Sequence, residues 1–298
     1  MRILLTGKGG QVGHALQRRL ATNADLFAVG SADCDLANPD AIRALVKRVK
    51  PNVIINPAAY TAVDRAESEP EAAHAVNAVA PGILAEQAEA CGATLIHFST
   101  DYVFDGLLTR PYTELDPPCP TSVYGASKLA GEQAIQSACS RYLILRTSWV
   151  YGLHGNNFAK TMLRLATERD SLNVVDDQFG TPTSAERLAE VTGQLLTHAH
   201  LSDASGVYHI TPTGQTNWHA YASHVIQKAH DLGWPLRTPV GAINAIPTSA
   251  YPTPARRPAN SVLSTAKFQD TFDLPLPAWQ TDVDLFVSQL DKERATRR

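Results

Sequence analysis

The first half of the chain alternates short hydrophobic runs with longer stretches in which apolar residues recur at helical spacing. Polar or glycine-containing turns flank each short run, a pattern typical of buried parallel strands. The expected strands are Arg2–Thr6, Leu26–Val29, Val53–Ile55, Thr94–Ser99 and Tyr142–Leu145. The expected helices cover residues 11–21, 39–49, 70–91 and 123–138. Repeated βα units with right-handed crossovers predict an α/β fold with a doubly wound parallel sheet of Rossmann type.

The pattern becomes irregular after Tyr151. A helical stretch covers Phe158–Glu168, shorter elements follow, and prolines punctuate Pro235–Pro258. A chain of 298 residues is long enough for a large domain and a smaller lobe. We therefore expect a dinucleotide-binding domain over 1–150, joined by parts of 174–190 and 236–255. A smaller α/β substrate-binding lobe would take up most of 151–298.

Composition excludes several classes of function. The formal net charge of -3 gives no general attraction to nucleic acids or acidic membranes. No apolar run approaches the roughly 18 residues of a membrane span, and the N-terminus lacks a signal-peptide pattern. The four cysteines form no C-x-x-C pair, so ordinary thiols in a reducing, cytoplasmic compartment are expected. Residues 291–298 are interpreted as a solvated tail.

A glycine-rich segment follows the first expected strand. Gly7, Gly10 and Gly13 lie between this strand and the first expected helix. Glycines there allow a tight turn, a close approach of backbone amides to a pyrophosphate, and close helix packing, while the helix N-terminus adds partial positive charge. The alternative is a connector without a ligand. Its place in a βα array favours a dinucleotide site.

The ends of the next two strands bear on the choice of cofactor. Gly30 follows the second strand where an NAD-dependent enzyme commonly has an acid, so acceptance of NADPH at least as well as NADH is expected. No arginine replaces that acid. Asp35 and Leu36 suit the adenine edge, with an ordinary surface loop as the alternative. Small residues after the third strand, in the segment 56–64, would let cofactor sugars approach the backbone; a plain strand-to-loop connection is the alternative.

The sharpest chemical signal is a Tyr and a Lys four residues apart. Tyr124 and Lys128 open the helical stretch 123–138 and share one helix face, while Thr100 ends the preceding strand. A nearby ammonium is expected to lower the pKa of the phenol from about 10 toward the working range. Such a Tyr can act as general acid to a carbonyl oxygen during hydride transfer. An isolated pair of this spacing is more often surface packing, but here it accompanies the glycine loop and Thr100.

Several segments together resemble the dTDP-4-dehydrorhamnose reductases of the extended short-chain dehydrogenase class. They are the glycine loop, 100–104, the Tyr124/Lys128 pair, 146–151, 155–158, 177–182 and 251–258. The resemblance covers nearly the whole chain, and its later segments are the ones specific to these reductases. It implies reduction of the C4 ketone of a dTDP-4-dehydro sugar by a reduced nicotinamide.

The resemblance also implies roles for single residues. The catalytic set would be Thr100, Tyr124 and Lys128. Besides the three glycines, the cofactor would contact Gln11, Val12, Asp35, Leu36, Ala58, Ala59, Tyr60 and Lys128. The sugar nucleotide would contact Thr100, Tyr102, Tyr124, Trp149, Asn157 and Arg256. For Tyr102, Trp149, Asn157 and Arg256 the alternative is ordinary packing or surface structure.

The sequence assigns neither a metal ion nor a single oligomeric state. Family members that bind magnesium at a dimer contact use glutamates; Glu186 matches one, whereas Ala15 and Gln289 stand at the other positions. No metal is therefore assigned, and either a monomer or a homodimer is compatible with the sequence. His198 and His200 have no third ligand at useful spacing, which favours a solvated helix end.

Two rival functions remain at this stage. The catalytic residues would equally suit reduction or epimerisation of another 4-keto nucleotide sugar. Because a fold does not fix a function, the same architecture could also serve as a non-catalytic, cofactor-binding regulatory subunit.

Overall fold

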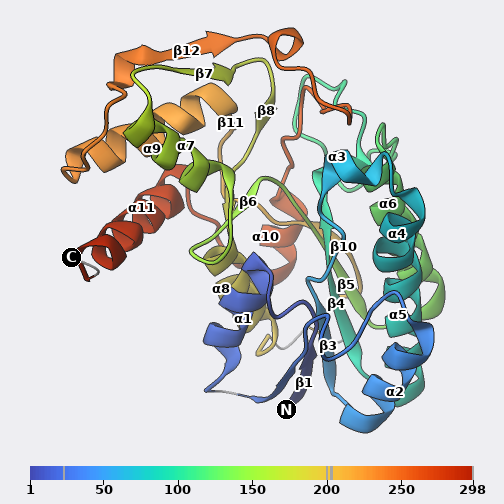
Figure 1. The fold of residues 1–298 in the computed structure, drawn as a ribbon. Coiled ribbons are helices and arrows are strands. Elements are labelled where there is room, and N and C mark those ends of the chain that lie inside the picture. Colours follow the sequence, from blue (N-terminus) through green and yellow to red (C-terminus); the bar gives the residue numbers. More distant parts are fainter. Residues whose placement is uncertain (23, 199–200, 202–203, 297–298) are drawn as a thin grey trace.

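A six-stranded parallel sheet organises the larger part of the molecule. The computed structural model describes residues 1–22, 24–198, 201 and 204–296. The strand order is β10-β5-β4-β3-β1-β2, and every neighbouring pair is parallel (Figure 1). The strands are β1 (Arg2–Leu5), β2 (Asp25–Ala28), β3 (Val53–Asn56), β4 (Thr94–Thr100), β5 (Tyr142–Thr147) and β10 (Gly206–His209). The strand order reverses direction between β1 and β3, where ligands of such sheets bind at the carboxyl ends of the strands.

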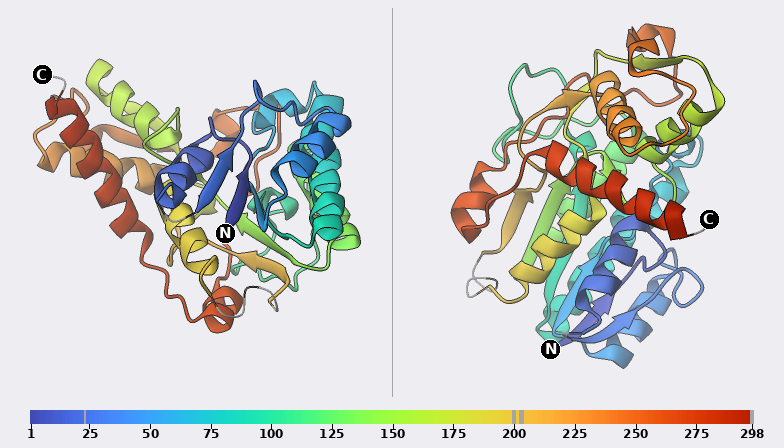
Figure 2. Two further views of the ribbon diagram at one scale, coloured as in Figure 1. Left: turned by 90° about the horizontal axis from the view of Figure 1, so that it is seen from below. Right: turned by 90° about the vertical axis from the view of Figure 1, so that its left-hand side faces the viewer.

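Helices cover both faces of this sheet (Figure 2). On one face, α1 (Gln11–Leu20), α8 (Ala185–Leu195) and α10 (Ala266–Phe272) bury apolar side chains against the sheet. On the other face, α2 (Pro39–Val49), α5 (Ala80–Cys91) and α6 (Val123–Ala138) do the same. Burial of β1, β3, β4 and β5 on both faces explains why these strands are mostly hydrophobic, whereas the edge strand β2 is partly exposed. The expected doubly wound α/β fold is confirmed.

A smaller group of elements packs at the carboxyl edge of the sheet. It contains α7 (Phe158–Glu168), α9 (Trp218–Asp231) and α11 (Trp279–Thr296), around two apolar clusters. The short paired strands are β7 (Leu172–Val175) with β12 (Ile243–Ile246), β8 (Phe179–Gly180) with β11 (Thr216–Asn217), and β6 (Val150–Tyr151) with β9 (Thr183–Ser184). Short 3-10 turns cover Val240–Ala242 and Thr248–Ala250.

The two halves of the sequence are interleaved in space. Helix α8 and strand β10 come from the second half but belong to the large sheet and its covering layer, whereas β12 pairs with β7 in the smaller group. The division into 1–150, with parts of 174–190 and 236–255, and 151–298 stays a prediction. Within the described residues, no helix is both long and apolar enough to cross a bilayer.

The expected helix over 70–91 is interrupted. Helix α4 (Pro70–His74) runs through a π-helical turn at Ala75–Val79 into α5. Two further short elements lie near the carboxyl edge of the sheet: α3 (Val63–Ala66) and a 3-10 turn at Asp101–Val103 directly after β4. π-helical turns often occur at functional sites, because the extra residue redirects neighbouring side chains.

Candidate active site

The glycine loop connects β1 to α1 with almost no spare volume. Gly7 has a φ of +60°, and a Cβ there would lie 2.9 Å from the Cα of Ala58. A Cβ on Gly13 would lie 2.0 Å from the carbonyl oxygen of Gly7. Gly10 is the N-cap of α1, and no described side chain caps the first turn, which begins with Gln11 and Val12. The amides of that turn therefore suit an anionic group such as a pyrophosphate.

A cation that the sequence reasoning did not assign lies at the end of β2. Lys8 Nζ is 2.6 Å from Asp33 Oδ2, and the Lys8 side chain passes within contact distance of Gly30. The ion pair with Lys8 lowers the pKa of Asp33. Asp35 is exposed and accepts a hydrogen bond from the amide of Ala37, while Leu36 is partly buried. Lys8 thus supplies a positive charge at the end of β2, where the sequence has no arginine.

The π-helical turn fixes the loop that follows β3. Asn77 accepts from the amide of Tyr60 at 2.7 Å and donates to the Tyr60 carbonyl at 3.1 Å. It also donates to Ser127 Oγ on α6. Ala58, Ala59 and Tyr60 are thereby held beside the glycine loop, partly buried. Asn77 carries out this positioning, and no periodic pattern in the sequence singled it out.

Tyr124 and Thr100 come together at the carboxyl edge of the sheet. Thr100 is the last residue of β4, and Tyr124 stands in the first turn of α6, whose N-cap Ser122 accepts from the amide of Gly125. Thr100 Oγ1 lies 2.9 Å from Asp101 Oδ1. Burial raises the pKa of Tyr124, and the hydrogen bond with Thr100 opposes that rise. At neutral pH the phenol keeps its proton, as a general acid must.

The expectation that Lys128 lowers the pKa of Tyr124 is wrong for this structure. Lys128 is buried, and its Nζ donates to the carbonyl oxygen of Phe98 at 2.7 Å and lies 3.1 Å from His97 Nε2. Desolvation raises the pKa of Tyr124, the neighbouring Asp101 and Tyr102 raise it further, and only the hydrogen bond with Thr100 opposes the rise. The same desolvation lowers the pKa of Lys128 to about 8, although Glu132 opposes this shift.

Trp149 forms an aromatic platform beside β5. Its ring stacks on Trp218 with centroids 3.6 Å apart and planes 13° apart. The backbone of Trp149 has a φ of +47°, a conformation that a bulky residue adopts only when its surroundings impose it. A Cβ at Gly180 would lie 2.5 Å from the Trp149 ring. The lack of a side chain at Gly180 therefore leaves the space that the Trp149 indole occupies.

An arginine different from the expected one contacts Tyr102. Arg257 donates to Asp64 Oδ2 at 2.7 Å and to the Tyr102 hydroxyl at 3.4 Å. The Tyr102 ring meets that of Tyr124 edge to face, with centroids 5.6 Å apart. Arg256 is exposed. Arg257 and Tyr102 thus join the segment 255–257 to the carboxyl edge where the expected catalytic residues Thr100 and Tyr124 meet, which we term the catalytic edge.

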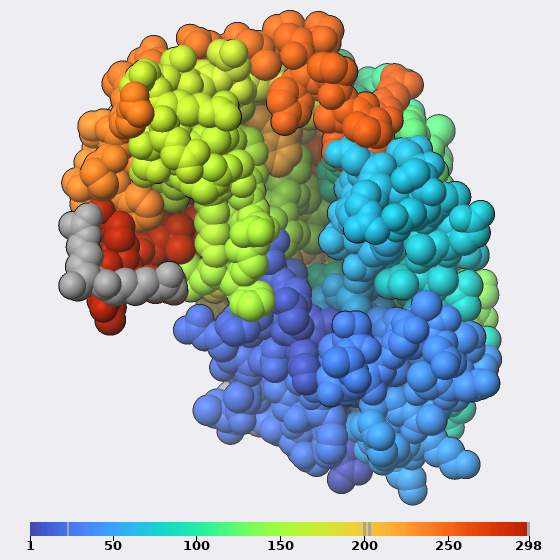
Figure 3. Space-filling model, viewed as in Figure 1, coloured from blue at the N-terminus to red at the C-terminus, as the bar shows by residue number. Residues whose placement is uncertain are grey.

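Asn157 has structural contacts that the sequence did not predict. It is the N-cap of α7 and accepts from the amide of Lys160, while its Nδ2 donates to Gln11 Oε1 at 3.0 Å and to the Gly152 carbonyl at 2.8 Å. It therefore ties the smaller group of elements to the start of α1. The space-filling view shows a hollow between these two parts (Figure 3).

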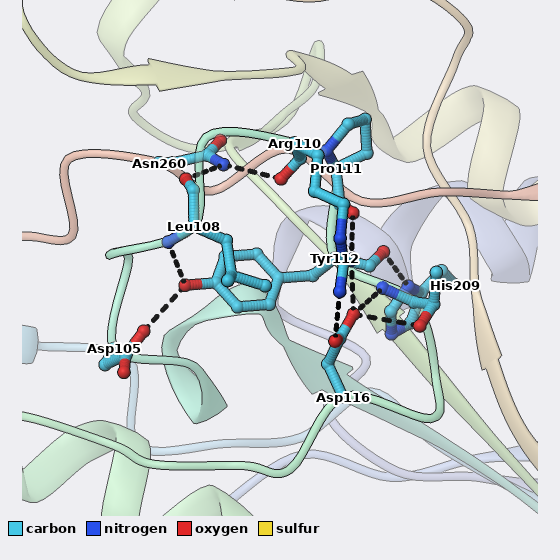
Figure 4. Close-up of polar contacts among 9 residues, drawn as sticks. Asp105, Leu108, Arg110, Pro111, Tyr112, Asp116, His209 and Asn260 are labelled. Carbon is cyan, nitrogen blue, oxygen red and sulfur yellow. Dashed lines mark hydrogen bonds and ion pairs between the residues drawn. The ribbon is translucent and has the colours of Figure 1, made fainter.

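The loop after Thr100 is fastened by its own hydrogen bonds (Figure 4). The Tyr112 hydroxyl donates to Asp105 Oδ1 and accepts from the amide of Leu108, and the Tyr112 ring stacks on Phe104. Asn260 reaches the same loop by donating to the carbonyl of Leu108. The loop beside the catalytic edge is held at both its base and its tip.

No group of three or more His, Cys, Asp or Glu side chains in the described part of the chain could hold a metal. Glu186 and Gln289 line a small surface pocket of about 100 Å³, and Ala15 is buried. His198 packs edge to face against Phe272, and His200 lies outside the described residues.

Comparison with known proteins gives a consistent result. Residues 1–292 match the family described as RmlD substrate binding domain. The chain is 50% identical over 295 residues to the dTDP-4-dehydrorhamnose reductase of Escherichia coli K12, covering 97% of this chain and 98% of that relative. It is 45% identical to the enzyme of the same name from Burkholderia thailandensis, covering 97% and 99%.

A solved structure agrees with these relatives. The crystal structure of dTDP-4-dehydrorhamnose reductase from Bacillus anthracis in complex with NADP superposes with a TM-score of 0.90 at 34% identity. The match covers 97% of this chain and 99% of that one.

Proposed function

This chain belongs to the RmlD substrate-binding-domain family, and from that premise we propose that it reduces the C4 ketone of dTDP-4-dehydro-L-rhamnose to give dTDP-L-rhamnose, the last step of dTDP-rhamnose biosynthesis. It is an NAD(P)H-dependent oxidoreductase. The observation that carries the proposal is the meeting of Thr100 and Tyr124 at the carboxyl edge of the sheet, beside the glycine loop, in a chain of this family.

The residues around the glycine loop fit a dinucleotide. The missing side chains of Gly7 and Gly13 let the loop pack closely against Ala58 and against itself, and the first turn of α1 presents free amides to a pyrophosphate. Ala58 to Tyr60 would line the nicotinamide side, and Asp35 and Leu36 the adenine side. A reduced nicotinamide bound there supplies the hydride for C4 of the sugar.

The chain's own residues handle the proton. Tyr124 gives its phenolic proton to the carbonyl oxygen as the C4–oxygen double bond becomes an alcohol, and Thr100 donates a hydrogen bond to the same oxygen. Lys128 would contact the ribose beside the nicotinamide. Trp149, Tyr102 and Arg257 would bind the sugar nucleotide, and Arg256 stays a proposal beside them. The proposal includes no metal ion and holds for a monomer as for a homodimer.

The finer cofactor preference is for NADPH, with NADH also accepted. No acid follows β2 directly in the sequence; the Asp33 carboxylate reaches the amide of Gly30, but Lys8 pairs with it and lies against Gly30, where we place the 2′-phosphate. The four free cysteines suit the reducing, cytoplasmic location that we include in the proposal.

One assay tests the function and its rivals together. NADPH oxidation is measured with dTDP-4-dehydro-L-rhamnose and with a panel of other 4-keto nucleotide sugars, for the wild type and for Tyr124→Phe. Wild-type turnover should be fastest with the rhamnose precursor, and the variant should be slower by roughly 100-fold or more while still binding NADPH. Faster turnover of another sugar would support the rival substrate. No turnover with any sugar would support the regulatory subunit, and full activity of the variant would remove Tyr124 from the mechanism.

A further inference from the structure

We propose that His97 is a positioning residue for Lys128, and that Thr6, Asn56 and His97 form a buried polar row that orients the Lys128 amine toward the catalytic edge. The proposal rests on the reductase function above. It deepens the site, because it adds residues that touch neither the substrate nor the expected cofactor.

The row crosses three neighbouring strands in one line. Thr6 follows β1, Asn56 ends β3 and His97 lies in β4, with Asn56 and His97 paired in register. Thr6 Oγ1 donates to Asn56 Oδ1 at 2.5 Å, and Asn56 Nδ2 lies 3.0 Å from His97 Nδ1. His97 Nε2 lies 3.1 Å from Lys128 Nζ. The three side chains of the row are at most 1% exposed.

Such burial is unfavourable unless each polar group has a partner. Thr6 and Asn56 stand at the ends of apolar strands and His97 lies between two apolar residues of β4, yet each interacts with the next side chain in the row. Because this row of satisfied polar groups ends on the expected catalytic amine of Lys128, it can fix the orientation of that amine. A purely structural row could end on any backbone carbonyl.

Neutral His97 can serve Lys128 in both of its protonation states. Burial and the adjacent Lys128 charge lower the pKa of His97 well below its usual value, so the imidazole stays neutral. With the proton on Nδ1, Nε2 accepts a hydrogen bond from the ammonium; with the proton on Nε2, it donates to the neutral amine. In the orientation that the structure shows, Asn56 Nδ2 faces His97 Nδ1 as a donor, which fits the tautomer with the proton on Nε2. A half-turn of the Asn56 amide fits the other tautomer, because it brings Oδ1 to Nδ1–H while the Thr6 hydroxyl accepts from Nδ2.

The row leaves one Lys128 proton for the active site. An ammonium has three N–H donors. The Phe98 carbonyl takes one at 2.7 Å, and His97 takes another when its Nε2 carries no proton. These two fixed acceptors set the direction of the third, which is the one available to a ligand at the carboxyl edge. Without His97, Lys128 Nζ could rotate about its last bond with a single acceptor to hold it.

Other charges near Lys128 are few and fixed. From α6 itself, Glu132 raises the pKa of Lys128, and Tyr124 lies one turn in the other direction. From β5, Arg146 forms a buried two-point ion pair with Glu132, with Nη2 and Oε2 2.6 Å apart. From β4, His97 contributes no charge because it is neutral. Removal of His97 therefore changes the hydrogen bonding of the ammonium and leaves its charged surroundings in place.

Two amide variants separate the contacts of His97. The amide of His97→Gln reaches the position of Nε2 and faces Lys128, whereas the amide of His97→Asn reaches only the position of Nδ1 and faces Asn56. Both are neutral and both disturb the row. If the contact with Lys128 matters, Gln should keep most of kcat while Asn loses roughly tenfold or more.

The pH profile gives a readout that general destabilisation does not move. In His97→Asn the buried ammonium lacks one acceptor, so its pKa falls and the alkaline limb of kcat/KM moves to lower pH by about one unit. The limb of His97→Gln should stay near that of the wild type. Equal losses in both variants with unshifted limbs would overturn the proposal, even if both variants fold normally.

A measurement without substrate keeps this test apart from the function. Nitrogen-15 spectra of the wild-type protein at pH 6.5, where Lys128 is an ammonium, should show His97 neutral and protonated on Nδ1, with Nε2 accepting from Lys128 and the Asn56 amide turned so that its oxygen faces Nδ1. An Nε2–H tautomer or a charged imidazole at that pH would overturn the proposal whether or not the enzyme turns over the expected sugar. Lack of turnover by the wild type, with the expected tautomer present, would instead contradict the proposed function alone.

Discussion

At the scale of single residues, the proposed preference for NADPH rests on one lysine that is already paired. Lys8 forms its ion pair with Asp33, whose side chain also accepts from the amide of Gly30. A 2′-phosphate carries more charge than a carboxylate and would compete for Lys8. We expect Lys8→Ala to lower kcat/KM for NADPH about tenfold, equivalent to roughly 1.4 kcal/mol, and to change that for NADH little.

Asp33→Asn is the matched control for this prediction. It releases Lys8 from its partner without moving it from the end of β2. The preference for NADPH should therefore persist or increase in initial-rate measurements. An unchanged ratio of the two cofactors in Lys8→Ala would mean that the lysine is only a surface ion pair, which typically contributes little.

Two adjacent arginines, Arg256 and Arg257, are candidates for binding the substrate, and their contacts differ. Arg257 contacts both Tyr102 and Asp64, whereas Arg256 is exposed. A guanidinium held beside the catalytic edge suits a diphosphate. We expect Arg257→Ala to raise the KM for the sugar nucleotide about tenfold and to leave the KM for NADPH nearly unchanged.

Arg256→Ala provides the comparison, because it removes the same charge one residue away. A tenfold rise in the sugar-nucleotide KM there, with none in Arg257→Ala, would return the role to Arg256. Equal loss for both ligands in Arg257→Ala would indicate that breaking the pair with Asp64 disturbs the fold.

At the scale of elements, the turn from β1 to α1 depends on a glycine inside the helix. Alanine is normally the better helix former by about 1 kcal/mol, so Gly13→Ala would stabilise an unconstrained helix. Here its Cβ would meet the backbone of Gly7 at 2.0 Å, which forces α1 away from the loop. We expect a lower Tm and a roughly tenfold or greater loss of NADPH affinity in calorimetry.

Gly9→Ala tests the same loop without the clash. No atom lies within 4 Å of a Cβ at this position. Its stability should change by no more than about 0.5 kcal/mol. If both substitutions behaved alike, the loop would tolerate more movement than the close packing of Gly13 against Gly7 implies.

The elements also show what the sequence could predict. Strand and helix periodicity predicted five of the six strands of the large sheet, and α2, α6 and α7 with their observed bounds. Strand β10 was missed because it is a short run in a region without the βα alternation. The π-helical turn was missed because it keeps helical spacing on both sides. The expected catalytic residues could be named because they follow a motif, and their roles stay predictions.

Features that depend on contacts between distant segments could not be predicted from the sequence. Neighbouring arginines in an irregular loop have no periodicity that says which one points inward, so the choice between Arg256 and Arg257 needs the fold. The sign of the Tyr124 pKa shift likewise depends on burial, which the spacing of Tyr124 and Lys128 does not report. The sequence did contain a sign that His97 has a specific role, because a histidine stands between apolar residues in an expected buried strand.

At the scale of the whole molecule, the candidate site lies between the large sheet and the smaller group of elements. A hydrogen bond between Gln11 at the start of α1 and Asn157 at the start of α7 joins the two. The stacked rings of His14 and His154, with centroids 4.3 Å apart, lie on the same seam, where His154 Nε2 is 3.1 Å from the carbonyl of Gly9. The glycine loop is therefore supported from both parts of the chain.

Two substitutions of Asn157 separate its two tasks. Asn157→Ala loses both the cap of α7 and the link to Gln11, whereas Asn157→Ser keeps a capping oxygen but loses the donors to Gln11 and Gly152. We expect thermal unfolding to show Ala less stable than Ser by about 1 kcal/mol. Both variants should bind NADPH several-fold more weakly by the same factor, because the start of α1 loses the same support. If Asn157 instead contacts the sugar nucleotide, the KM for that substrate would rise in both variants while NADPH binding stayed intact. The role of Asn157 would then be substrate binding and not support of α1.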